Sequence, residues 1–194
     1  GSEMCIRDSY DRARVVTYKG GFNFSRINNF GRKYAAGKYL LLLNNDVEVI
    51  NGDWLTQMVA LADHDDMLAP HAVYCMGKAL AESGAAFAYS DEALFEKTPE
   101  HPRVGHFKPD YAPEYLMAVN YICHLAVFKK ELFEAVGGER PECDGAQDHD
   151  LFLRLIDAMQ AKDANAAPLH IPQVLYYWRV HAASTSGGTE AKPY

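Results

Sequence analysis

The feature that most constrains the fold is a short apolar run that ends abruptly in polar residues, KYLLLLNND at positions 38–46. Four consecutive leucines are typical of a strand that is buried on both faces of a sheet. Polar groups at the end of such a strand lie at the carboxyl edge of the sheet, where open α/β sheets bind their ligands. The stretch therefore predicts an α/β fold with a ligand site beside residues 44–46.

Strand and helix patterns alternate along the rest of the chain. A strand is expected at 14–20, and a helix over 23–37 with Asn23 or Ser25 as N-cap and Gly37 as its stop. Further strands are expected at 85–96, near 118–129 and from 171, with helices over 51–62, 70–83, 130–136 and 147–160. Residues 97–115 hold four prolines and are expected to form a loop. Such alternation is typical of parallel βαβ units around one sheet.

Composition excludes several classes of protein. A chain of 194 residues that is 48% hydrophobic can bury one substantial core. The net charge of −7 argues against a nucleic-acid partner, because phosphate backbones require a cationic surface. Four dispersed cysteines without a CxxC pair favour reduced thiols and a cytoplasmic protein. No apolar run reaches the roughly 20 residues of a membrane span, which leaves a peripheral association at the inner face of the membrane open.

Both ends of the chain look non-natural. The opening GSEMCIRDS has no apolar core of a signal peptide, and it resembles a translated sequencing adapter. We therefore expect residues 1–9 to be non-native and the domain to lie within residues 10–194. The final GGTEAKPY has neither a terminating helix nor a polar tail, so a cut at this end is expected as well.

Acidic and other polar side chains gather where the pattern predicts strand ends or a helix start. These residues are Asp46, Asp91, Glu92, Asp148 and Asp150, followed after the last strand by Trp178, Arg179 and His181. Each acid taken alone is more often a solvated group or a helix cap than a catalyst. For Asp150 we favour a helix cap over a catalytic role, because Asp150 shares the first helical turn with Asp148.

The order of these motifs resembles the family 2 glycosyltransferases of the GT-A fold, especially those that assemble bacterial surface polysaccharides. The matching segments are NFSRINNFGRKYAAGKYLLLLNND, YSDE, FKPDY, NYICHL, GAQDHDLFLRL and WRVH. The resemblance implies a Rossmann-like, mostly parallel sheet with flanking helices, here lacking its first strands. It also implies transfer of a hexose or rhamnose from a nucleotide-diphosphate sugar to a saccharide or lipid-linked acceptor.

Sugar transfer requires stabilisation of a leaving diphosphate. A divalent cation provides this, and Mg²⁺ or Mn²⁺ is held by one or two carboxylates plus the phosphates. By resemblance, Asp46 and His181 are the metal ligands. Asn44, Asn45, Arg179 and Trp178 are implied to lie at the donor diphosphate.

The acceptor hydroxyl must lose a proton as it attacks, so a carboxylate should face it. By resemblance this general base is Asp148, and a direct displacement implies inversion at the anomeric carbon. Asp91 and Glu92 are expected on the acceptor side. His124, within an apolar strand, is expected to be a hydrogen-bonded core histidine.

A second stretch, VALADHDDMLAPHAVY at 59–74, resembles another version of the same metal motif. A single glycosyltransferase domain needs only one metal motif. The chain is therefore either a join of two related domains, with a seam near Met58, or a domain that carries an insertion. In the joined form, Asp63, Asp65 and Asp66 are the alternative metal ligands.

Two other function classes stay open. The chain could be a non-catalytic remnant or carbohydrate-binding module of the same fold, or part of a nucleotidyltransferase. Because the first strands of the fold would hold the nucleobase, we expect this chain to be inactive by itself. The sequence leaves the sugar, the acceptor and the oligomeric state undetermined.

Overall fold

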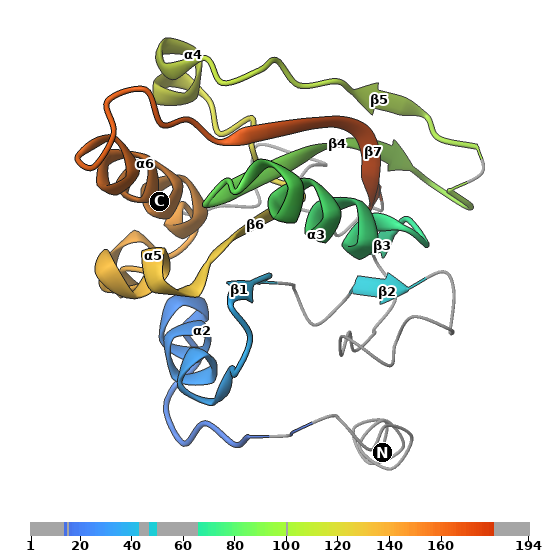
Figure 1. Ribbon diagram of the computed structural model, residues 1–194. Coiled ribbons are helices and arrows are strands. Elements are labelled where there is room, and N and C mark those ends of the chain that lie inside the picture. Colours follow the sequence, from blue (N-terminus) through green and yellow to red (C-terminus); the bar gives the residue numbers. More distant parts are fainter. Residues whose placement is uncertain (1–13, 15, 43–46, 50–65, 100, 181–194) are drawn as a thin grey trace.

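The computed structural model describes residues 14, 16–42, 47–49, 66–99 and 101–180, and these form one sheet with helices on both faces (Figure 1). The sheet has seven described strands: β1 (Tyr39–Leu40), β2 (Val47–Val49), β3 (Asp66–Leu68), β4 (Phe87–Phe95), β5 (Val104–His106), β6 (Ala126–Lys129) and β7 (Leu169–Arg179). The helices are α2 (Phe24–Gly31), α3 (Ala72–Ser83), α4 (Pro113–Ala118), α5 (Lys130–Ala135) and α6 (Gln147–Gln160), with short 3₁₀ turns at Arg32–Tyr34 and Pro141–Cys143.

The expected α/β class with flanking helices is confirmed, but the strand directions are mixed. The spatial order is β1-β6-β4-β7-β3-β2, with β5 beside β4. Only β2–β3 and β4–β7 are parallel among the described pairs, and the other four pairs are antiparallel. The expectation of a mostly parallel sheet is therefore wrong for the described strands. The reason is that β6 runs opposite to both of its neighbours, β1 and β4, while β5 runs opposite to β4 and β3 runs opposite to β7.

Alternating side chains of the central strands divide the core into two layers. Phe87 and Tyr89 of β4 pack against α4, α5 and α6, whereas Ala88 between them packs against α3 on the other face. Phe128 and Val127 of β6 divide in the same way. Period-two alternation is what a strand covered on both faces requires. The central strands are therefore fixed in register by burial on both sides.

Several helix boundaries match the sequence, but α2 ends at Gly31 with a 3₁₀ turn to Tyr34, and not at Gly37 as expected. Asn23 is the N-cap of α2, and its side chain accepts a hydrogen bond from the backbone N of Arg26 at 2.9 Å. Gly84 ends α3 with φ of 72°, a left-handed conformation that glycine adopts without a Cβ clash. The apolar stripe predicted for α6 is fully buried: Leu151, Phe152, Leu155, Ile156 and Met159.

Three expectations differ from the structure, and a fourth falls on residues that the structure does not describe. Within the leucine run the described strand is only the two-residue β1, which lies at an edge of the sheet and is not buried in its centre. The described residues within 14–20 form no strand, because no described strand lies beside them to accept their hydrogen bonds. The segment 97–115, expected to be a loop, contains β5 and the start of α4. The helix expected over 51–62 lies outside the described residues.

Asp91 and Glu92 also lie differently from expectation, in the middle of β4 and not after its end. The pairing of β4 with β7 shifts register on both sides of Asp91, so that Ser90 pairs with Ile171 but Asp91 pairs with Val174. Pro172 falls in this irregularity, where the missing N–H of proline costs no ladder hydrogen bond. The irregularity allows polar side chains to enter a buried part of the sheet.

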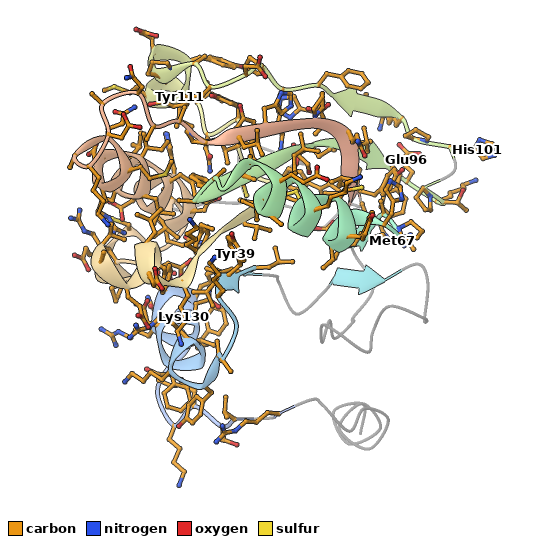
Figure 2. All side chains as sticks on the ribbon, viewed as in Figure 1. Tyr39, Met67, Glu96, His101, Tyr111 and Lys130 are labelled. Atoms are coloured by element: carbon orange, nitrogen blue, oxygen red, sulfur yellow. The ribbon has the colours of Figure 1, made fainter. Side chains whose placement is uncertain are left out.

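A polar contact joins the segment that follows α2 to the start of α5. Lys130 Nζ donates to the carbonyl of Ala35 at 2.6 Å, and Lys130 is labelled beside α2 in Figure 2. Across the parts of the chain described above, the longest helices are too short and too polar to cross a bilayer.

Candidate functional site

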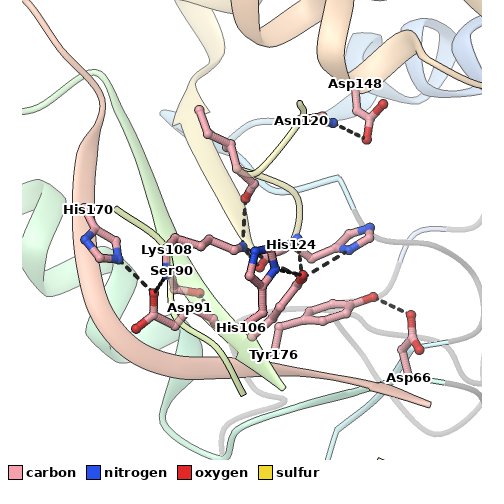
Figure 3. Close-up of polar contacts among 12 residues, drawn as sticks. Asp66, Ser90, Asp91, His106, Lys108, Asn120, His124, Asp148, His170 and Tyr176 are labelled. Carbon is pink, nitrogen blue, oxygen red and sulfur yellow. Dashed lines mark hydrogen bonds and ion pairs between the residues drawn. The ribbon is translucent and has the colours of Figure 1, made fainter. Parts of the chain in front are cut away.

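Asp148, the predicted catalytic base, lies in the first turn of α6, where an acidic group complements the helix dipole. Its Oδ2 accepts a hydrogen bond from Asn120 Nδ2 at 3.0 Å (Figure 3). Its Oδ1 accepts one from the backbone N of His149 at 2.9 Å. The carboxylate is therefore held by two donors from two different segments, which fixes its orientation.

A cavity of about 120 Å³ lies beside this carboxylate. Its lining is apolar except at a few points, as small-molecule sites generally are. The lining residues are Phe24, Leu42, Cys123, His124, Leu125, Ala126, Phe128, Glu139, Gln147, Asp148, Leu151, Phe152 and Tyr176. A carboxylate in the wall of such a cavity can accept a proton from a bound hydroxyl group.

Aromatic rings close one side of the cavity. The ring of His124 stacks on Tyr176 with centroids 4.7 Å apart and meets the edge of Trp178 at 5.6 Å. The side chain of His124 is 30% exposed and its buried Nδ1 has no hydrogen-bond partner among the described residues. The expectation of a hydrogen-bonded core histidine is therefore wrong: the ring is partly exposed and stacks on Tyr176, and its Nδ1 lies 3.7 Å from Glu92 Oε2, beyond hydrogen-bond distance.

Cys123 lies next to Asp148 in the cavity wall. Burial of the thiol and the neighbouring Asp148 carboxylate raise the pKa of Cys123 well above its ordinary value. The thiol is therefore protonated at neutral pH and is a weak hydrogen-bond donor to Asp148, not a nucleophile.

Glu92 is the centre of a polar network with His106, Lys108 and His124, three residues that are labelled in Figure 3. Its Oε2 accepts from the backbone N of His124 at 2.6 Å and lies 3.8 Å from Lys108 Nζ, while Oε1 lies 2.9 Å from His106 Nδ1. Burial alone would raise the pKa of Glu92. The hydrogen bonds from His124 and the Lys108 charge outweigh burial and lower the pKa to about 2.

Lys108 joins this network to the cavity wall. Its side chain is completely buried, and Nζ donates to the carbonyl of Ile122 at 3.1 Å and to that of His124. Burial lowers the pKa of Lys108, and the Glu92 charge opposes this effect. Glu92 and Lys108 together fix residues 122–124, which form part of the cavity lining.

Asp91 points to the opposite side of the network. Its Oδ1 accepts from the backbone N of Lys108 and lies 2.9 Å from His170 Nε2. The second ring nitrogen of His170 lies 3.0 Å from Asp110 Oδ1. Neither Asp91 nor Glu92 lines the cavity, so their expected place on the acceptor side stays a prediction.

Asp66 and Arg179 join the ends of β3 and β7. The buried Asp66 carboxylate accepts from Tyr176 Oη at 2.7 Å and from the backbone N of Arg179 at 2.9 Å. The Arg179 guanidinium lies 4.5 Å from the centre of the Phe95 ring. Asp66 thus has protein donors on both oxygens, and the roles predicted for Asp66, Arg179 and Trp178 at the donor stay predictions.

Asp150 forms ion pairs and does not cap α6. Its Oδ2 accepts from Arg154 Nη2 at 2.5 Å, and its Oδ1 accepts from Arg140 Nη1 at 3.2 Å. Arg154 also donates to the carbonyls of Val136 and Gly138 at 2.9 Å. The prediction that Asp150 caps the helix is therefore wrong. Its contacts are ion pairs within the protein, which are structural contacts as a helix cap would be.

The predicted metal motif cannot be placed. The residues concerned, Asn44, Asn45, Asp46, His181, Asp63 and Asp65, lie outside the described residues. Among the described residues, no group of three or more His, Cys, Asp or Glu side chains is arranged to hold a metal ion.

Two site residues were not recognised in the sequence. Asn120 belongs to the motif NYICHL, and a polar residue just before a buried strand was the available signal. Glu139 follows two glycines and has no local pattern that predicts burial. It becomes buried only through contacts with α2, which is more than 100 positions earlier in the chain.

Comparisons with known proteins find relatives that match this chain over a small part of their own length. No family model matches the chain. It is 37% identical over 152 residues to the uncharacterized protein y4gI of Sinorhizobium fredii, covering 78% of this chain and 16% of that protein. It is 39% identical over 126 residues to the O-antigen biosynthesis protein RfbC of Myxococcus xanthus, covering 64% of this chain and 9% of that protein. The chain thus spans less than a fifth of the curated relatives it matches.

Among solved structures, the chain resembles S. aureus TarS 1–349 in complex with UDP, with a TM-score of 0.49 and 14% identity. That match covers 83% of this chain and 41% of the TarS chain. At this level the structural similarity says nothing about activity. The second relative is named for O-antigen biosynthesis, and this chain corresponds to 9% of its length.

Proposed function

We propose that this chain carries the acceptor half of a glycosyltransferase site, in a family 2 enzyme of bacterial surface-polysaccharide synthesis. The observation that carries the proposal is the Asp148 carboxylate, held by Asn120 and the His149 amide in the wall of a cavity. The 39% identity to an O-antigen biosynthesis protein supports a role in surface-polysaccharide synthesis.

The proposed reaction is a direct displacement. Asp148 takes the proton of an acceptor hydroxyl, whose oxygen forms a bond to the anomeric carbon of the donor sugar. The bond from that carbon to the diphosphate oxygen breaks, and its electron pair leaves with the nucleoside diphosphate. Attack opposite to the leaving group inverts the anomeric carbon.

On the donor side we propose the residues that follow β1, the last residues of β7 and His181. Arg179 can bind phosphate oxygens with its planar guanidinium, and the Trp178 ring contacts the His124 ring of the cavity wall. Asn44, Asn45, Asp46 and His181 are proposed to hold the diphosphate and its Mg²⁺ or Mn²⁺. The cation would neutralise charge on the leaving group.

The acceptor is proposed to be a saccharide or lipid-linked saccharide, and the donated sugar a hexose or a rhamnose. The cavity suits part of a sugar ring, since Phe128, Phe152 and Leu151 offer apolar contacts and Asp148 offers an acceptor oxygen. We place the enzyme in the cytoplasm, with the inner face of the membrane as the site of a lipid-linked acceptor.

Radiolabelled nucleotide sugars, tested with a protein that contains this chain together with its donor site, provide the direct test. Asp148→Asn removes the proton acceptor but keeps an oxygen for Asn120. We expect it to lower kcat by about 100-fold or more, with donor binding retained. Asp157→Asn, exposed on the same helix, is the matched control and should transfer like the wild type.

Unchanged turnover in Asp148→Asn would contradict the assignment of the base. Saccharide binding that needs neither nucleotide nor metal, without any transfer, would instead favour a carbohydrate-binding module of the same fold.

A further inference from the structure

Glu139 is a second acidic group in the wall of the cavity that contains Asp148. Only 3% of its surface is exposed, and both carboxyl groups line the same cavity of about 120 Å³. Glu139 belongs to the segment between α5 and α6, so two separate elements bring an acid to one small space. A buried carboxyl group has a considerable desolvation cost, so its protonation depends strongly on the few polar groups around it.

The helix α2 holds Glu139 in this position. Asn29 accepts a hydrogen bond from the backbone N of Glu139 at 3.0 Å and donates one to its carbonyl at 2.7 Å. Asn28 Nδ2 donates to Glu139 Oε2 at 3.1 Å. Consecutive amides thus fix both the backbone and the carboxyl group of Glu139.

Within the part of the chain that the structure describes, no cation forms an ion pair with Glu139. Arg154 is the basic group that faces it, but its guanidinium is already bound to Asp150 and to two backbone carbonyls. The acidic groups that face Glu139 are Asp148 on α6 and Asp144 in the preceding loop. Burial, opposed by the Asn28 hydrogen bond and assisted by these two acids, raises the pKa of Glu139 to about 7.

We infer that Glu139 is a positioning residue for Asp148, because its proton determines whether the cavity contains one negative charge or two. This inference rests on the proposed function, in which Asp148 receives the proton of the acceptor. With Glu139 protonated, its hydroxyl is a donor to a sugar oxygen or to Asp148. With Glu139 ionised, a second negative charge favours transfer of a proton into the cavity.

Carboxyl-carbon NMR of the 194-residue chain tests the coupling without any need for activity. Between pH 4 and pH 9 we expect the Glu139 signal to titrate with a midpoint near 7. The Asp148 signal should move over the same range. In Glu139→Gln, which mimics the protonated form and can still accept from Asn28, this movement of Asp148 should disappear. Glu142→Gln, exposed three positions later, is the matched control and should leave it unchanged.

A second variant keeps the inference testable if Glu139→Gln fails to fold. Asn28→Ala removes the hydrogen bond that stabilises the ionised carboxylate, so the Glu139 midpoint should move to higher pH. A Glu139 midpoint below pH 5.5, or a movement of Asp148 that survives in Glu139→Gln, would overturn the inference. The two signals can behave as expected while no protein that contains the chain transfers sugar. In that case the proposed function is wrong, and the inference that the charge of Glu139 acts on Asp148 is retained.

Discussion

Neutralising Glu92 should destabilise the protein strongly, and the size of the effect follows from its surroundings. In Glu92→Gln the charge that faces Lys108 and the His124 amide is lost, although the shape is retained. The pKa of Glu92 falls from 4.5 to about 2 in the folded protein. At about 1.4 kcal/mol per pKa unit, the ionised form contributes roughly 3 kcal/mol to stability at neutral pH. The buried Lys108 ammonium would lose its counter-charge as well.

The dependence on pH has a definite sign. Because the folded pKa is depressed, this stabilisation is fully present above the unfolded value of 4.5 and is lost as the pH falls toward 2. Urea unfolding of wild type and Glu92→Gln, followed by far-UV circular dichroism between pH 3 and pH 7, measures the difference. We expect about 3 kcal/mol at pH 7 and a clear decrease at pH 3.

Glu96, four positions later, provides the matched control. It pairs with Arg103 at 2.6 Å, but the two side chains are 53% and 62% exposed. Glu96→Gln should therefore change stability by less than about 1 kcal/mol at either pH. A loss below about 1 kcal/mol for Glu92→Gln at pH 7, or a difference that is the same at pH 3, would refute the electrostatic explanation.

Two further predictions concern stability and can be measured by the same unfolding assay. Tyr176→Phe removes a donor from the buried Asp66 carboxylate and should cost about 1–3 kcal/mol, whereas Tyr177→Phe at the next position should cost less. Gly77→Ala, within α3 and with no atom within 4 Å of an added Cβ, should stabilise the protein by about 0.5–1 kcal/mol. Gly84→Ala has equal space but a φ of 72°, so it should destabilise by about 1–2 kcal/mol. Equal effects of the two alanine substitutions would show that backbone conformation is not the cause.

The sequence predicts those parts of the fold whose signal is local. The stripe from Leu151 to Met159 identifies α6 and its buried face, because helical periodicity depends only on nearby positions. The largely apolar run at 85–96 identifies β4 for the same reason. Strand direction was not predictable, because it depends on which distant strands become neighbours in the sheet.

The site was predictable only in part, and for the same reason. Asp148 was identified because its motif and its helix start are contiguous in sequence. Glu92 and Lys108 are 16 positions apart, and the burial of both in one network is a property of the irregular pairing between β4 and β7. Glu139 requires α2, whose contacting residues are 110 and 111 positions away. Long-range polar contacts of this kind have no sequence period.

The segment 120–126 limits how such a site can be redesigned. Asn120 orients Asp148, the carbonyls of Ile122 and His124 accept from Lys108, and Ala126 pairs with Tyr89 of β4. The same few residues therefore both shape the cavity and hold the sheet together, so altering them to fit another sugar would also weaken the fold. Leu151 and Phe152 line the cavity from α6, and their apolar side chains form no hydrogen bonds. A designer who wishes to change the shape of the cavity should begin on that helix face.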